Sequence, residues 1–148
     1  CYTAPGCVPY LAQPGHFERL HEAWLHLGRV GAILGPHGCG KSTLLAYLED
    51  VWAKEHDYRV THVALHDGER TLPEALSQSD FLERDLLVID GYEQLGWFAR
   101  WRLNRLRRRN GCGLLVTTHL ASRLPTLYRV EPSFETLLAV VRQLLAPQ

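Results

Sequence analysis

Eight consecutive residues have the types and spacing of a loop that binds phosphate. They are Gly35, Pro36, His37, Gly38, Cys39, Gly40, Lys41 and Ser42. An oligophosphate needs several backbone N–H groups pointing at it, and only a loop with few Cβ atoms wraps closely enough to supply them. The Lys41 ammonium can reach the terminal phosphates, and the Ser42 hydroxyl can bind Mg²⁺. We therefore expect the chain to bind a nucleoside triphosphate with Mg²⁺.

The sequence on either side of this loop supports the same interpretation. Residues 30–34 form an apolar run that predicts a strand, and residues from Thr43 onward have apolar side chains at helical spacing. Strand, glycine-rich loop and helix in this order are the context that a phosphate-binding loop requires. A helix that begins there adds unpaired N–H groups and the positive end of its dipole. The predicted nucleotide contacts therefore run from Gly35 to Thr43.

A second candidate ligand ends another apolar run. Asp90 follows residues 86–89, which read Leu-Leu-Val-Ile. Continuous apolarity predicts a strand buried on both faces, as in a parallel sheet, and ligands bind at the carboxyl ends of such strands. A carboxylate at that edge can bind Mg²⁺ together with Ser42. The alternative is that Asp90 caps the helix that follows.

Predicted strands and helices alternate along the chain. Strands are expected at residues 29–34, 58–65, 85–90, 114–118 and 126–130, with 58–65 near an edge of the sheet. Helices are expected at residues 16–27, from the phosphate loop to about 54, at 71–76, over most of 91–110 and from 133 onward, with a further helical turn at 80–84. This alternation predicts one α/β domain over residues 1–148, in three layers, with a mostly parallel sheet of about five strands.

The first 15 residues read as an irregular lead-in, because they are rich in Pro, Gly and small residues. Tyr10 within it has two interpretations: stacking on an adenine ring, or covering the edge of the core. The sequence begins at Cys1 and contains no Met, so we expect the initiator to be absent and leave open a fragment of a longer protein.

Composition bounds the class of protein. The 16 basic and 16 acidic residues cancel, so no global field favours nucleic acid or membrane. Apolar runs are too short for a membrane span, and the four cysteines are expected to be free thiols. These features favour a cytoplasmic protein.

Two motifs together resemble those of a known group of ATPases. The run from Gly35 to Ser42 resembles a Walker A motif, and the run ending at Asp90 resembles a Walker B motif. The strand at 114–118, which ends in polar residues, is similar to the additional strand of the ABC-type, AAA+-type and recombinase-type ATPases. The resemblance spans residues 29–119 and implies a P-loop fold in which that strand lies between the two motif-bearing strands, with ATP and Mg²⁺ as ligands.

The resemblance also implies roles for two residues that end the additional strand. Thr118 or His119 would sense the terminal phosphate, and His119 is similar to the switch histidine of ABC-type enzymes. The alternative for His119 is a partly exposed histidine at the end of a strand. The ABC signature motif is missing, which argues against a transporter subunit.

The sequence departs from the group directly after Asp90, where Gly91 stands in place of the usual catalytic Glu. Glu93 lies two positions further on. If the backbone turns at Gly91, Glu93 can point toward the attacking water and act as the general base. It can equally be a glutamate in the first turn of a helix, placed there by the helix dipole.

Six arginines crowd one predicted helix beside Trp97 and Trp101. They are Arg100, Arg102, Arg105, Arg107, Arg108 and Arg109. This helix can be a solvated face, a surface for a protein partner or neighbouring copy, or a nucleic-acid contact, which the neutral net charge does not favour. An arginine finger for another subunit is a further role, for which Arg70 and Arg123 are alternatives.

Three functions remain open on the sequence alone. The first is an ATPase that hydrolyses ATP slowly, with Lys41, Glu93, His119 and Thr118 as catalytic residues, and couples its nucleotide state to a partner or to self-assembly. The second is a nucleotide-binding switch without significant turnover, which Gly91 favours. The third is a small-molecule kinase. The sequence has no strongly basic segment between the fourth and fifth strands, and this argues against a kinase.

Overall fold

Five strands form one sheet in which every neighbouring pair is parallel. In the computed structural model, which describes residues 15–131, the spatial order of the strands is β2-β3-β4-β1-β5. Their bounds are β1 (Val30–Leu34), β2 (Arg59–Ala64), β3 (Asp85–Asp90), β4 (Gly113–Thr118) and β5 (Thr126–Arg129). β4 therefore lies between β1 and β3, as the resemblance implied for the additional strand.

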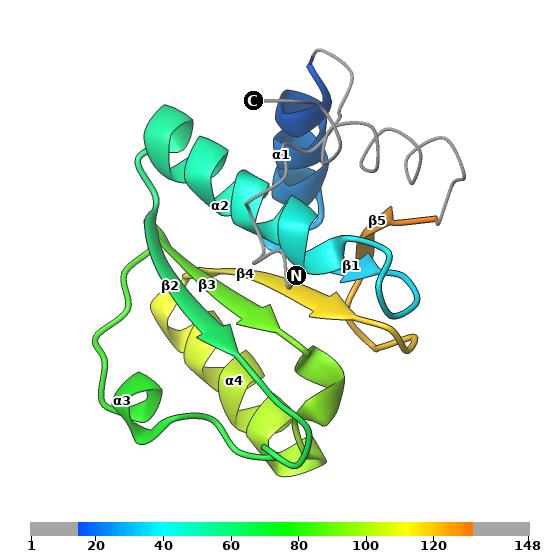
Figure 1. Ribbon diagram of the computed structural model, residues 1–148. Helices are drawn as coiled ribbons and strands as arrows, with labels where there is room; N and C mark the ends of the chain where they lie inside the picture. Colours follow the sequence, from blue (N-terminus) through cyan, green and yellow to red (C-terminus); the bar gives the residue numbers. More distant parts are fainter. Residues whose placement is uncertain (1–14, 132–148) are drawn as a thin grey trace, which may run out of the picture.

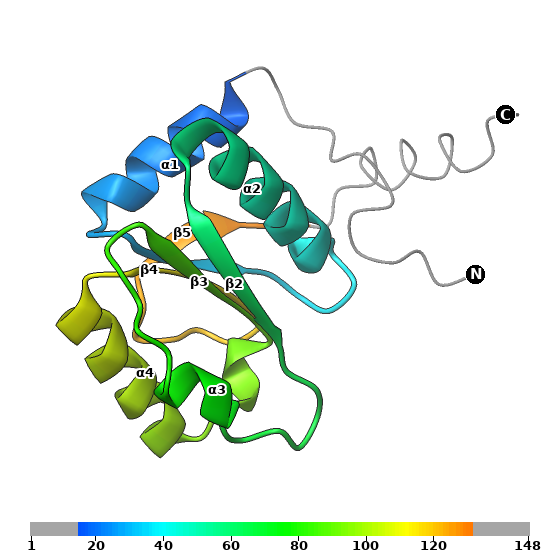
Figure 2. The same cartoon turned by 90° about the vertical axis from the view of Figure 1, so that its left-hand side faces the viewer.

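Helices cover both faces of this sheet (Figures 1 and 2). The helices are α1 (His16–His26), α2 (Lys41–His56), α3 (Glu74–Ser77), the 3₁₀ turn η1 (Tyr92–Gln94) and α4 (Trp97–Asn110). α1 and α2 pack on one face, where Trp24, Leu45 and Trp52 meet Ile33 and Val88 of the strands. The other face packs against η1, α3 and α4. The expected three-layer α/β architecture is confirmed.

The burial of each strand follows from its place in the sheet. β1 and β4 are buried along their whole lengths, and β3 is buried except at its last residue, Asp90. All three have a strand on each side and helices above and below. β2 has no buried residue, which agrees with the predicted edge position. Continuous apolarity thus identified the strands at the centre of the sheet.

The predicted helical turn at residues 80–84 is wrong. Residues 80–82 have no regular structure, and residues 83 and 84 form a turn that leads into β3. The buried Asp85 carboxylate accepts the backbone N–H of Leu82 at 2.6 Å and so holds this turn. Arg59 donates two further hydrogen bonds to the same carboxylate, each at 2.6 Å. Burial alone would raise the pKa of Asp85, but these hydrogen bonds and the guanidinium charge hold it below its usual range.

Two other predicted helices have different bounds. The short helix begins at Glu74 rather than at residue 71, and Pro73 precedes it. Residues 91–110 form two helical pieces, η1 and α4, because Gly96 is extended and caps α4. Tyr10, most of the predicted lead-in and the helix expected from residue 133 lie outside the described residues.

Aromatic side chains fill the layer between α1, α2 and the sheet. Trp24 and Trp52 are fully buried, with ring centroids 5.0 Å apart. Trp24 also donates its indole N–H to the Leu114 carbonyl at 3.0 Å. Gly113 makes room for that indole, because a Cβ there would lie 2.5 Å from the ring.

Across residues 15–131, no helix is long and apolar enough to cross a bilayer.

Candidate functional site

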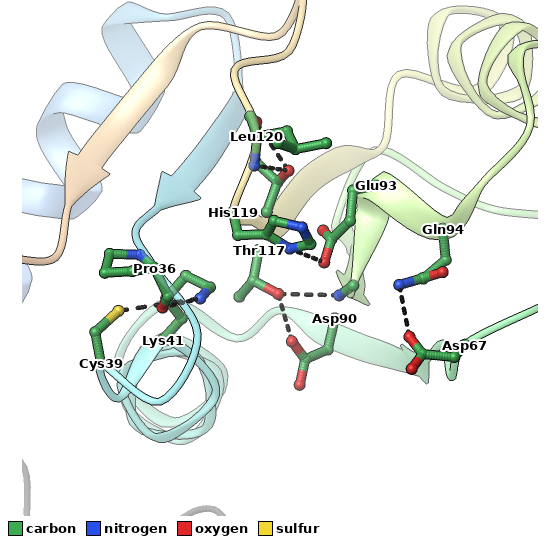
Figure 3. Close-up of polar contacts among 12 residues, drawn as sticks. Pro36, Cys39, Lys41, Asp67, Asp90, Glu93, Gln94, Thr117, His119 and Leu120 are labelled. Carbon is green, nitrogen blue, oxygen red and sulfur yellow. Dashed lines mark hydrogen bonds and ion pairs between the residues drawn. The ribbon is translucent and has the colours of Figure 1, made fainter.

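The two motif-bearing segments meet at one edge of the sheet. In the β1–β4 register Leu34 lies beside Thr118, and in the β3–β4 register Ile89 lies beside Val116. The loop that follows β1 and the carboxylate that ends β3 are therefore at the same edge, separated by the end of β4 (Figure 3). This is the carboxyl edge, where open parallel sheets bind ligands.

Glycine is required at particular points of the loop between β1 and α2. Gly38 and Gly40 have φ of 74° and 89°, in the left-handed region, and Gly40 caps α2. A Cβ at Gly35 would lie 2.7 Å from both the Cys39 sulfur and the Val130 carbonyl oxygen. The chain thus folds back tightly on itself and delivers the first turn of α2, with Lys41 and Ser42, to the sheet edge.

Lys41 closes this loop from within. Its ammonium donates a hydrogen bond to the Pro36 carbonyl at 2.7 Å and lies 4.0 Å from the Cys39 sulfur (Figure 3). A cation held against the centre of a glycine-rich loop is positioned to neutralise an anion bound there.

Thr117 holds the acidic end of β3 in place. Its hydroxyl donates to the Asp90 carboxylate and accepts the backbone N–H of Gly91 at 3.0 Å. Thr117 itself is 1% exposed. Sequence reasoning named its neighbours Thr118 and His119 but missed Thr117, although a polar residue near the end of an apolar strand was the signal available.

Gly91 explains why no glutamate directly follows Asp90. Its φ of 85° lies in the left-handed region, and a Cβ there would be 2.9 Å from the Leu65 carbonyl oxygen. A glutamate at this position would be both strained and crowded. The backbone instead turns into η1, which carries Glu93, so the turn at Gly91 on which the interpretation of Glu93 depended is present.

Glu93 and His119 are brought together at this edge. His119 Nδ1 and Glu93 Oε1 are 2.6 Å apart, and Figure 3 shows the two side chains pointing toward one another. Glu93 is 10% exposed, and its other oxygen, Oε2, is buried without a hydrogen bond among the described residues. The ring of His37, from the phosphate loop, packs against His119 with centroids 4.1 Å apart. His37 thus links the loop to the Glu93–His119 pair.

Thr118 has a different environment from His119. It is 1% exposed, and its hydroxyl both donates to the Leu120 carbonyl at 2.9 Å and accepts the Leu120 N–H at 3.2 Å. The hydroxyl therefore holds the turn that follows β4, whereas the His119 ring faces Glu93 and the loop.

The arginine-rich helix contacts the segment that carries Glu93. Arg100 donates to the Glu93 carbonyl at 3.0 Å and to the Leu95 carbonyl at 2.9 Å, and its guanidinium lies 5.0 Å from the centroid of the Tyr92 ring. At least this arginine is structural, rather than part of a solvated face. The proposed finger residues Arg70 and Arg123 are exposed loop residues.

Comparison with known proteins concerns the fold alone. No family model matches the sequence. Among solved structures, the chain is similar to C. elegans PCH-2, with a TM-score of 0.52 and 19% identity over 86% of this chain and 44% of that one. Protein NMB1076 from Neisseria meningitidis is 21% identical over 77% of this chain and 76% of that one, but its TM-score of 0.41 is too low to argue from. The chain thus covers less than half of the PCH-2 chain. Its own parallel α/β sheet is compatible with a P-loop-like fold.

Proposed function

We propose that the chain is a P-loop ATPase of the additional-strand group, which binds Mg-ATP between the loop of residues 35–42 and Asp90 and hydrolyses it slowly. The observation that carries this proposal is the meeting of the glycine-rich loop, Asp90 and the Glu93–His119 pair at one sheet edge, with β4 between the two motifs. The order of strands is the one that the resemblance implies, and the loop opens directly into α2.

The residues at this edge fit a bound divalent cation. The Thr117 hydroxyl holds the Asp90 side chain in place, and a carboxylate supplies oxygen ligands of the kind that a hard cation binds. Ser42 lies in the first turn of α2, at the end of the loop. When bound, Mg²⁺ would neutralise charge on the phosphate oxygens.

Hydrolysis would use the remaining groups of the site. Lys41 would leave the Pro36 carbonyl and pair with the terminal phosphates, and the loop N–H groups would hold them. Glu93 would accept the proton of the attacking water as the bond to the terminal phosphoryl group breaks, giving ADP and phosphate. His119, hydrogen-bonded to Glu93 and packed on His37, would orient that carboxylate and sense the phosphate.

A second function is favoured by one specific observation. One oxygen of Glu93 is bound to His119 and the other is buried, so in this conformation neither oxygen is open to an attacking water. If the pair stays closed when nucleotide is bound, the protein is a nucleotide-dependent switch without significant turnover. Opening of the pair by a partner or a second copy would instead give an ATPase that is slow until it is activated.

The test is phosphate release from Mg-ATP, measured beside calorimetric binding of ATP. We expect Lys41→Ala to lose both, and Glu93→Gln to keep binding but lose about 100-fold or more of the release rate, the size of a general-base contribution. Gln94→Ala is the matched control, because this neighbour on η1 hydrogen-bonds to Asp67 instead. Equal release rates for E93Q and Q94A would contradict the role of Glu93, and binding without any release would support the switch.

A further inference from the structure

Two adjoining hollows lie on the sheet face opposite α1 and α2. They have volumes of about 350 and 290 Å³ and lie between residues 70–77 and α4. Leu72, Phe98 and Arg102 line both, so they form one continuous depression, which we call the α4 groove. The groove is separate from the phosphate loop, because no residue of positions 35–43 lines it.

The groove combines an apolar floor with exposed aromatic side chains. Leu76 is buried in the core, and Leu72 and Leu106 pack partly buried beside it. Along α4, Trp97 is 81% exposed, Phe98 52% and Trp101 51%. Three large aromatic residues exposed side by side on one helix are a costly arrangement, and such patches mark binding sites.

The charge of the groove has one sign. Arg70, Arg102, Arg105 and Arg109 line it, and no carboxylate does so among the described residues. α4 holds six arginines and no acidic residue in a chain whose net charge is zero. The groove is therefore a local basic surface, and an occupant that pairs with it must carry negative charge.

The aromatic geometry argues against a single-stranded nucleic acid as that occupant. The Trp101 ring stacks with Phe98 at 5.7 Å, and the Arg105 guanidinium lies 5.5 Å from its centroid. These intramolecular contacts occupy ring surface that bases would need for stacking. Hollows with a leucine floor are instead suited to apolar side chains.

We propose that the α4 groove binds an acidic amphipathic segment of a partner protein. Its apolar side chains fill the two hollows over Leu72 and Leu106, and its carboxylates pair with Arg105 and Arg109 at the rim. This arrangement follows the way amphipathic segments enter apolar grooves, with arginine as the natural partner of carboxylates.

The groove also reaches the segment that carries Glu93. Gly96, which lines the second hollow, donates its N–H to the Arg70 carbonyl at 3.0 Å and caps α4. Arg100 ties the first turn of α4 to the Glu93 carbonyl. An occupant that shifts the start of α4 would therefore move Glu93 relative to His119. This link rests on the proposed function, whereas the binding itself does not.

The direct test measures binding without nucleotide. The probe is a fluorescent peptide with leucines at positions i, i+3, i+4 and i+7 and glutamates elsewhere, titrated with the chain and followed by anisotropy. Its comparisons are a scrambled peptide of the same composition and an oligothymidylate strand. We expect the amphipathic peptide to bind at least about 10-fold more tightly than either, with affinity falling as salt increases.

Adjacent arginines supply a matched pair of variants. Arg109 lines the groove and Arg108 does not, although both are exposed in the last turn of α4. We expect Arg109→Glu to weaken peptide binding at least about 10-fold, and Arg108→Glu, which changes the net charge equally, to change it less than about 2-fold. Circular dichroism melts check that all variants fold.

Several results would overturn the proposal. These are tighter binding of oligothymidylate than of the peptide, equal affinity for the scrambled peptide, and equal losses in the groove variant and R108E. A separate measurement of phosphate release with saturating peptide tests the link to Glu93. Binding without a change in release would remove that link and leave the docking site, whereas failure of hydrolysis alone would leave the binding result unaffected.

Discussion

The two faces of the sheet use the same aromatic residue types in opposite ways. On the face covered by α1 and α2, Trp24 and Trp52 are fully buried and pack on one another. On the face covered by α3 and α4, Trp97 and Trp101 are mostly exposed. Two long helices close the first face, whereas α3 has only four residues and leaves part of α4 uncovered. Coverage by a second element, rather than residue type, decides which tryptophans stabilise the fold.

The closed face also places polar groups in the interior. His21 is 7% exposed, hydrogen-bonds to the Tyr58 hydroxyl at 3.0 Å and stacks on His56 with centroids 3.6 Å apart. Desolvation, with the nearby His56 and Arg29, lowers the pKa of His21 to about 4. We therefore expect the closed face to dominate stability and its dependence on pH, and the open face to dominate binding.

The largest expected effect is on the closed face. Trp24→Ala removes a fully buried indole together with its hydrogen bond to the Leu114 carbonyl. We expect a loss of about 3–5 kcal/mol in the free energy of unfolding, measured by urea denaturation. A loss below about 1 kcal/mol would show that α1 contributes little to the core.

A smaller effect should appear when the pH is lowered. An unfolded histidine takes up a proton near pH 6.5, whereas folded His21 resists protonation down to about pH 4. Stability from this group is therefore constant above pH 6.5 and falls as the pH decreases from 6.5 to 4, by about 3 kcal/mol in total.

The measurement is the free energy of unfolding of the parent and of His21→Phe across this pH range. The parent should lose stability relative to H21F as the pH falls. Tyr58→Phe is the control, because it removes the same hydrogen bond but keeps the buried imidazole. If the parent and H21F have parallel pH profiles, His21 is not the group responsible.

The smallest effect on stability is expected on the open face. Trp97→Ala removes a side chain that is 81% exposed, so the unfolding free energy should change by less than about 0.5 kcal/mol. The same variant should weaken binding of the acidic peptide several-fold, because Trp97 lines the second hollow. A loss of stability comparable to that of W24A would erase the contrast between the two faces.

Local patterns were enough to predict most of the fold. The apolar runs of β3 and β4 indicated central strands, and the mixed pattern of β2 indicated an edge. The errors arose where a distant contact overrode local preference. Residues 80–84 form no helix, because Asp85 binds the Leu82 N–H and also the Arg59 guanidinium. Arg59 is 26 positions away, and no local pattern contains that pairing.

The candidate site was predictable in its residues but not in its pairings. Asp90 was named from its place after an apolar strand, and Glu93 and His119 from the resemblance to the additional-strand ATPases. Their contacts depend on the register of β3 against β4, which places Thr117 on Asp90 and His119 on Glu93 from 27 and 26 positions away. The contact of Thr117 with Asp90 follows from this register, and the contact of His37 with His119 follows from the path of the loop. Neither the register nor the path is visible in one sequence. The roles themselves stay predictions.

The position of β4 between β1 and β3 has a consequence for folding. β1 and β3 carry the two motifs but do not pair with one another, and each pairs with a strand that is synthesised after both. Trp24 likewise donates to Leu114, 90 positions further along the chain. The phosphate loop therefore cannot face Asp90 until the last buried strand has been made. Such long-range closure slows folding, and a nascent chain that ends before β4 exposes two apolar strand edges to chaperones and to aggregation.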